Sequence, residues 1–234
     1  MVKNSFDTGP EAWCSYDYHA SIVDDGVNVF VLTVWAKAGG VNDSGYVWAN
    51  HRRWSADVPE SPVSILPLIM YQRWVNADPL DLRDAQVSVY LRGDGLQLHG
   101  AQCYFWVLAN STRWHYTANP LAISEGSWAA EPCRFTLKND ETLWQRSWAG
   151  DPRNPWPLER VLAQVESYGF SFTGFAREVS GRLCMDEFEI RRATHGTEFV
   201  KNHLGAIVLN SLGRISPRIA RIGTKIEAAA RRRN

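Results

Sequence analysis

The sequence predicts an all-β protein: an antiparallel jelly-roll β-sandwich with one short helix and a C-terminal amphipathic helical tail. Two observations lead to this prediction. Apolar residues alternate with polar residues in short runs, which is the pattern of strands that bury one face. Glycine and proline separate the runs, and no strand-helix-strand rhythm appears, so stacked antiparallel sheets are favoured over an α/β fold.

The clearest alternation lies in the middle of the chain. Apolar residues take every second position from Val87 to Leu91 and again from Cys103 to Val107. Gly93-Asp94-Gly95 and Gly100 separate these runs, and glycines in such places predict tight turns between antiparallel strands. We expect one shared core to contain Val89, Phe105, Val107, Phe170 and Phe172.

Further elements are expected on both sides of this region. Strands are predicted within Trp13 to Phe30, Tyr46 to Trp54 and Val63 to Trp74. Pro67 lies in the last of these, and because proline cannot donate a ladder hydrogen bond it predicts an edge position or a bulge. From Leu158 to Val165 the apolar residues have helical spacing, which predicts one short helix.

Charge and periodicity divide the chain into a β-sandwich body, residues 1–198, and a basic tail, residues 199–234. The whole chain has a formal net charge of zero, but residues 201–234 hold eight Lys and Arg and one acid. Apolar residues recur every three or four positions from Leu204 to Ile226, which predicts an amphipathic helix. Serine caps helices and proline fits their first turn, so two helices should meet at Ser216-Pro217.

The arginines of the tail flank its apolar stripe, and this combination predicts a docking surface. We expect the tail to contact a protein partner or a second copy of the chain in a homo-oligomer. A membrane surface is an alternative partner. Nucleic-acid binding is disfavoured, because it explains the charge but needs no apolar stripe.

The sequence shows no recognisable membrane span, secretory leader or metal-binding motif. No window approaches the roughly 18 apolar residues of a membrane span. Residues Met1 to Pro10 contain no apolar run, so no secretory leader is recognised and a cytoplasmic location is expected. The cysteines lack the spacing of a metal site, and we expect free thiols at Cys14, Cys103, Cys133 and Cys184.

Three segments resemble a known superfamily. The stretch from Leu162 to Ile190, which ends in Asp186-Glu187-Phe188-Glu189-Ile190, is similar to the closing hairpin of galactose-binding-like jelly rolls. The segment from Ala85 to Val107 looks like paired inner strands of that fold, and Phe6-Asp7-Thr8-Gly9 looks like its opening strand. Members include carbohydrate-binding modules and complex I intermediate-associated proteins. The resemblance implies the fold more strongly than the function.

The densest functional signal is aromatic. A flat ring stacks on the apolar face of a sugar while neighbouring polar groups bind its hydroxyls. If the apolar alternation faces the core, the residues between point outward, and we expect Arg92, Tyr104 and Trp106 to lie on one exposed face. The predicted glycan-binding set is Tyr90, Arg92, Tyr104, Trp106, Arg113 and His115. The alternative is that loops and the tail cover these faces and the aromatic residues belong to the core.

A metal site is a separate expectation. Asp7 and Asp186 are candidate ligands for a structural calcium ion, since calcium takes several oxygen ligands and the modules that the chain resembles often hold one. The alternative is that acids of the last strand are solvated or paired with Arg191 and Arg192.

Three functions remain open on the sequence alone. The leading hypothesis is a non-catalytic, lectin-like module that binds a glycan or polysaccharide and uses its tail for assembly. The second is an intracellular scaffold or assembly factor on the same fold. The third is a polysaccharide-active enzyme: a hydrolase would need paired acids such as Glu187 and Glu189, and a lyase a base such as His51, His99 or His115 beside Tyr and Arg.

Overall fold

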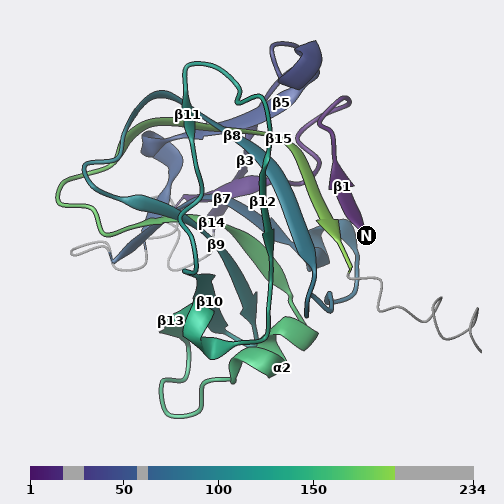
Figure 1. Ribbon diagram of the computed structural model, residues 1–234, viewed down its shortest axis with the longest axis vertical. Coiled ribbons are helices and arrows are strands. Elements are labelled where there is room, and N and C mark those ends of the chain that lie inside the picture. Colours follow the sequence, from purple (N-terminus) through teal and green to yellow (C-terminus); the bar gives the residue numbers. More distant parts are fainter. Residues whose placement is uncertain (18–28, 57–62, 193–234) are drawn as a thin grey trace, which may run out of the picture. The chain divides into compact units, whose positions relative to one another are not determined.

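The protein is a β-sandwich of two sheets. The computed structural model describes residues 1–17, 29–56 and 63–192, and the tail predicted at 199–234 therefore lies outside the described residues. No helix within the described ranges is long and apolar enough to cross a membrane. Figure 1 shows the described strands coloured by their position in the chain, and the described helix α2 contacts β9 and β10.

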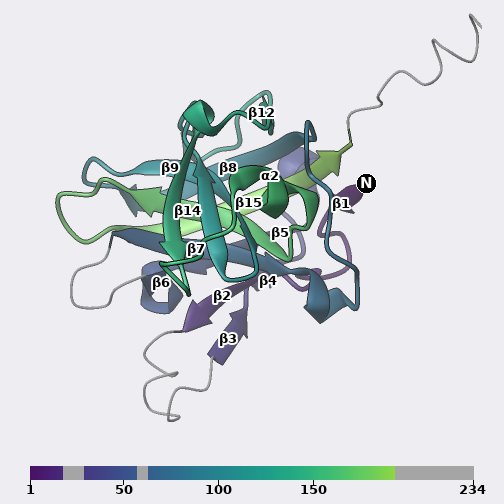
Figure 2. The ribbon, with the colours of Figure 1, turned by 90° about the horizontal axis from the view of Figure 1, so that it is seen from below.

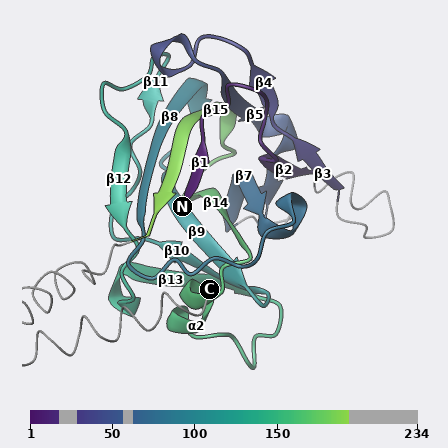
Figure 3. The same cartoon turned by 90° about the vertical axis from the view of Figure 1, so that its right-hand side faces the viewer.

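The first sheet contains seven described strands in the order β11-β8-β15-β5-β4, with β1 beside β15 and β12 beside β8. Figure 3 shows β11 and β12 alongside β8. β11 pairs with β8 in parallel, and the other described pairs of this sheet are antiparallel. The strands are β1 (Val2–Asn4), β4 (Val34–Ala36), β5 (Tyr46–Asn50), β8 (Gln86–Gln97), β11 (Ser124–Glu125), β12 (Cys133–Thr136) and β15 (Ser180–Arg191).

The second sheet contains eight described strands in the order β13-β10-β9-β14-β7-β2-β3, with β6 beside β7. All of its described pairs are antiparallel. Figure 2 shows β2 and β3 on the side of β7 away from β9. The strands are β2 (Cys14–Asp17), β3 (Val29–Leu32), β6 (Ser55–Ala56), β7 (Ser64–Tyr71), β9 (Gln102–Ala109), β10 (Thr112–Tyr116), β13 (Trp144–Ala149) and β14 (Ser167–Thr173).

The predicted helix is confirmed as α2 (Leu158–Ala163), which begins after Pro157. Its apolar face is buried through Leu158, Val161 and Leu162. Short 3₁₀ turns lie at Val41–Asp43, His51–Arg53, Gln72–Val75 and Glu141–Leu143.

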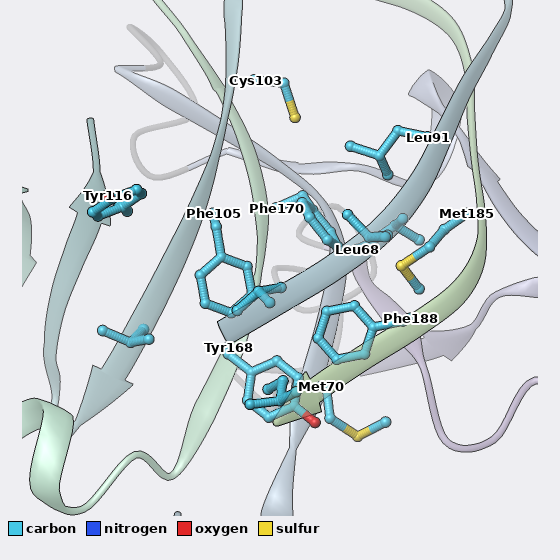
Figure 4. Close-up of a cluster of buried hydrophobic side chains, with 14 of the residues drawn as sticks. Leu68, Met70, Leu91, Cys103, Phe105, Tyr116, Tyr168, Phe170, Met185 and Phe188 are labelled. Atoms are coloured by element: carbon cyan, nitrogen blue, oxygen red, sulfur yellow. The ribbon is translucent and has the colours of Figure 1, made fainter. Parts of the chain in front are cut away.

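Aromatic side chains from both sheets meet in one core. Phe105 of β9 and Phe170 of β14 have ring centroids 5.8 Å apart, and Phe188 of β15 lies 6.5 Å from Phe105. Figure 4 shows these rings packed together with Tyr168. Val89, Phe105, Val107, Phe170 and Phe172 are all fully buried in this cluster, so the predicted core is confirmed.

The predicted hairpins between β8 and β9 and between β14 and β15 are wrong. β8 runs without interruption through Gly93-Asp94-Gly95, and the chain turns later, where His99 and Gly100 have φ values of 49° and 91°. β8 and β9 then lie in different sheets, and so do β14 and β15. In each pair the chain therefore crosses from one sheet to the other. The apolar sides of the two strands then face each other across the core, where both are buried.

Pro67 occupies a bulge in the middle of the second sheet. β7 lies between β14 and β2, and its register with β14 shifts between the pairs Phe170–Leu68 and Phe172–Ile65. The bulge accommodates a residue that cannot donate a ladder hydrogen bond. Of the two predicted settings, the bulge is confirmed and the edge is not.

Replacing Phe105 tests the core. Phe105→Ala should lower the free energy of unfolding by about 3 to 5 kcal/mol, because the ring contacts aromatic residues of both sheets and its removal leaves a cavity. Urea denaturation measures the change. Phe105→Leu, which keeps most of the volume, should cost about 1.5 kcal/mol or less, and equal losses for both variants would contradict this packing.

Candidate functional site

Four of the six predicted glycan-binding residues lie on one face. Tyr104 and Trp106 lie in β9, where they alternate with core residues, so they point to the outer side of the second sheet. His115 of β10 pairs with Trp106, and Arg113 pairs with Leu108. Residues paired across antiparallel strands share a side, so these side chains belong to the same outer face.

The other two residues lie on the opposite layer. Tyr90 and Arg92 belong to β8, in the seven-stranded sheet, and point to that sheet's outer side. The sequence prediction of a single face for Arg92, Tyr104 and Trp106 is therefore wrong. Alternation correctly separated inside from outside, but each sheet of a sandwich has its own outside.

Arg92 takes part in a cluster that holds loops on the seven-stranded sheet. Its guanidinium lies 4.8 Å from the ring centroid of Tyr46 and 4.4 Å from that of Trp128. Arg92 Nε donates to Asp94 at 2.9 Å, and Trp128 Nε1 donates to the carbonyl oxygen of Gly39 at 2.8 Å. These contacts join the segments that carry Gly39, Tyr46 and Trp128 to β8.

Trp106 is buried, and its expected exposure is wrong. Only 1% of its surface is accessible, and it packs with Cys14, Leu66 and Ile69 in a second apolar cluster outside the main core. Its Nε1 donates to the carbonyl oxygen of Phe170 at 3.0 Å. A Cβ on Gly169 would lie 3.0 Å from Trp106 Cζ2, so the glycine gives room for the indole beside β14.

A polar pocket opens beside this cluster on the same face. Its volume is about 480 Å³, within the range of small-molecule sites. Tyr104 and His115 line it, and the Tyr104 hydroxyl donates to Gln102 Oε1. The other polar side chains of the lining that share this face are Gln102, Gln145, Ser147 and Thr173. Arg146 also lines the pocket, but it pairs with Trp114 and its guanidinium lies 6.0 Å from that ring, on the other side of the sheet.

His115 is the most unusual residue of the pocket. It is 2% exposed, and its Nε2 is buried without a hydrogen-bond partner among the described residues. Burial first, and then the charge of Arg113, lower the pKa of His115 to about 3, so the imidazole is neutral at pH 7. Ser171 Oγ, on the residue that pairs with Tyr104, is also buried without a described partner. Such atoms cost free energy unless water or a ligand satisfies them.

Sequence reasoning missed part of this pocket. Gln102 lies two residues before Tyr104 on β9, and alternation alone was enough to place it on the same face. Gln145, Arg146 and Ser147 come from β13, whose pairing with β10 joins distant parts of the chain and leaves no local pattern. Only the sheet order brings them beside His115.

The two predicted calcium ligands have other partners. Asp186 is fully buried, and its Oδ2 accepts from the backbone N–H of Val41 at 2.7 Å and from Ser44 Oγ at 2.8 Å. Asp7 accepts from Ser5 Oγ at 2.8 Å. Within the described ranges, no group of three or more His, Cys, Asp or Glu could hold a metal ion. Burial raises the pKa of Asp186, and calcium binding stays a prediction.

The cysteine prediction is confirmed in the described part of the chain. All four thiols are free; Cys14, Cys103 and Cys184 are buried, and Cys133 is half-buried. Burial raises the pKa of Cys184 to about 12, so this thiol stays protonated at neutral pH.

The fold and pocket define a β-sandwich with a polar site on the outside of one sheet. No protein-family model and no curated protein matches the chain. Among solved structures, it is similar to the carbohydrate-binding module CtCBM11, with a TM-score of 0.38 and 11% identity over 70% of this chain and 85% of that one.

Two further solved structures are similar at the same level. One is the carbohydrate-binding module CBM28, described as specific for non-crystalline cellulose, with a TM-score of 0.37 and 10% identity over 82% of this chain and 94% of that one. The other is the K1 cleaved adhesin domain of Lys-gingipain from Porphyromonas gingivalis W83, with a TM-score of 0.34 and 16% identity over 81% and 96%. The two modules are of the kind that the sequence resemblance names, and at these TM-scores the function has to be argued from the chain's own residues.

Trp106→Ala should destabilise the protein, because the indole is enclosed by a second apolar cluster. We expect a loss of about 3 to 5 kcal/mol in the free energy of unfolding, measured by chemical denaturation. The matched control is Trp148→Ala on β13, where the side chain is 42% exposed; its cost should be about 0.5 kcal/mol. Similar values for the two variants would show that Trp106 is not enclosed.

His115 should make stability depend on pH. Its folded pKa is lowered to about 3, so below about pH 6.5 the unfolded chain takes up a proton that the folded chain does not. The free energy of unfolding that neutral His115 contributes is fully present above about pH 6.5. It is lost as pH falls toward 3, with a slope of up to about 1.4 kcal/mol per pH unit. The free energies of unfolding of the wild type and His115→Gln, measured across this pH range, test the prediction. If both change with pH by the same amount, the prediction is wrong.

Proposed function

We propose that this protein is a non-catalytic glycan-binding module and that the pocket on the outer face of the eight-stranded sheet is its ligand site. The observation that carries the proposal is His115, a buried neutral imidazole whose Nε2 has no described partner and which lines an open polar pocket. On this view the sandwich is of the jelly-roll type and uses a sheet face for recognition.

The chemistry of the pocket suits sugar hydroxyls. A hydroxyl group both donates and accepts, and the carboxamides of Gln102 and Gln145 offer both functions, as a neutral imidazole does. Tyr104 is half-exposed and offers a ring for the apolar face of a sugar. This mixture of one ring and several planar polar groups supports a saccharide ligand.

Hydrolysis finds less support in the described residues. None of the described side chains that line the pocket is a carboxylate, whereas glycosidases place two across the scissile bond. Glu187 lies 3.8 Å from Lys3 and Glu189 lies 2.8 Å from Arg191, so the paired acids of the sequence hypothesis form ion pairs.

A lyase is the second candidate, because Tyr104 and His115 line the same pocket and Arg113 donates a hydrogen bond to Ser147 of its lining. In a lyase the base removes a proton next to a carboxylate, and a cation stabilises the charge that develops. The lowered pKa of His115 makes it a weak base, which favours binding over catalysis. Ultraviolet absorbance of the unsaturated product, measured with uronate polymers, tests this candidate.

Assembly through the tail remains part of the proposal as a prediction. The tail lies outside the described residues, so the scaffold alternative depends on comparing the full chain with a tail-less variant. Light scattering of both proteins reports oligomer formation, and flotation with liposomes reports membrane association.

Tyr104→Ala should weaken glycan binding about fivefold or more, because removing a stacked ring costs about 1 kcal/mol. A glycan array identifies the ligand, and calorimetry on the best binder measures the affinity. Tyr104→Phe keeps the ring and should retain most of the binding.

The matched control for this experiment is Tyr90→Ala, on the outer face of the other sheet. It should leave binding unchanged. If Tyr90→Ala weakens binding and Tyr104→Ala does not, the ligand face belongs to the seven-stranded sheet.

A further inference from the structure

We propose that the ligand site extends beyond the pocket: Tyr104, His115 and Trp148 form a line across three strands that binds an internal stretch of a linear oligosaccharide or polysaccharide. This inference rests on the proposed glycan-binding function, names the class of ligand and adds Trp148 as a residue that contacts it. Its basis is the register of β9, β10 and β13.

Trp148 reaches the outer face of the eight-stranded sheet through a β-bulge in β13. In the register of β10 and β13, Trp114 pairs with Arg146. The next pair is Arg113 with Trp148, so Ser147 is an extra residue. Ser147 Oγ accepts from Arg113 Nε at 3.1 Å and lines the pocket, so it lies on the outer face. In a regular strand Trp148 would then face the core, whereas the bulge keeps it on the same side as Arg113.

The bulge turns a large apolar ring toward solvent. Trp148 is 42% exposed, more than any other tryptophan of the described residues. A Cβ on Gly150 would lie 3.4 Å from Trp148 Cη2, so the indole lies close to the backbone at the end of β13. Bulges often re-aim a side chain beside a functional site. An exposed indole next to an open polar pocket is suited to cover the apolar face of a sugar ring.

The strand register places Tyr104, His115 and Trp148 on one diagonal. His115 of β10 pairs with Trp106, which lies two residues after Tyr104 in β9. Arg113, two residues before His115 in β10, pairs with Trp148 of β13. Each step along the diagonal therefore crosses to the next strand and moves two residues in the same direction. With ordinary strand spacing and rise, each step is about 8 Å and the whole line is about 16 Å long.

A line of this length suits consecutive units of a linear saccharide. One sugar ring would lie over Tyr104 and another over Trp148, while hydroxyls between them reach His115 Nε2, which has no described partner. Gln145, paired with His115, and Ser147 add polar groups along the same path. Tyr104 is half-exposed and Trp148 is exposed, so a chain can continue past both. A monosaccharide would reach only one of the two rings.

Chain length tests the span of the site. The probes are linear oligosaccharides, from the disaccharide to the hexasaccharide, of the cello, xylo, manno and chito series and of any further backbone that the glycan array identifies. Calorimetry with the full-length protein measures each affinity. In the series that binds, affinity should rise from the disaccharide until the chain reaches both rings and then level off, because contacts on one chain reinforce each other.

Protein variants locate the second ring. Trp148→Ala should weaken binding of the hexasaccharide about fivefold or more, because one of two stacked rings is lost. The gain in affinity from disaccharide to hexasaccharide should shrink by the same factor, and Trp148→Phe should retain most of the gain. The matched control is Trp48→Ala, which removes a half-exposed indole from β5 of the other sheet and should leave binding unchanged.

The outcomes separate this inference from the proposed function. Equal affinities for disaccharide and hexasaccharide, still sensitive to Tyr104→Ala, would overturn the extended site and leave glycan binding standing. Unchanged hexasaccharide binding by Trp148→Ala, or equal losses from Trp148→Ala and Trp48→Ala, would also overturn the extended site. Failure of every glycan to bind the wild-type protein would overturn both.

Discussion

The contact between aromatic rings of the two sheets determines the rest of this structure. Phe105 and Phe170 from the eight-stranded sheet meet Phe188 from the seven-stranded sheet, and Trp13 adds a ring whose centroid is 4.9 Å from that of Phe188. Buried aromatic residues contribute large areas and prefer tilted or offset geometries. Once these rings face inward, strand alternation decides which residues face outward.

The outer face of the eight-stranded sheet shows what this constraint leaves for function. Trp106 alternates with Phe105 and Val107, so it points away from the core, yet it is buried again in a second cluster. The room for its indole depends on Gly169, where a side chain would also collide with the backbone of β7. The apolar half of the face is therefore structural, and the polar half beside it remains open.

The two outer faces use arginine in different ways. On the seven-stranded sheet, Arg92 is held between the rings of Tyr46 and Trp128 and paired with Asp94. On the eight-stranded sheet, Arg113 lies over the ring of Trp106 and donates to Ser147, beside a pocket in which His115 Nε2 and the nearby Ser171 Oγ lack described partners. Satisfied groups stabilise a fold, whereas unsatisfied ones beside an open pocket are suited to a ligand.

Local sequence pattern determined the fold class, the shared core and the helix that begins at Leu158, because each depends on the spacing of apolar residues. The missing N–H of Pro67 predicted an edge or a bulge, and the sheet order decided for the bulge. It also separated Tyr104 and His115 from the core. It did not determine that β8 and β9 enter different sheets, since both strands show the same alternation. Tertiary structure alone decided that Arg92 and Tyr104 lie on opposite faces, that Trp106 is covered, and that β13 brings Gln145 and Ser147 to the pocket of His115. The physical reason is that alternation specifies the side of a strand, whereas the partner across that side depends on how distant strands pair and pack.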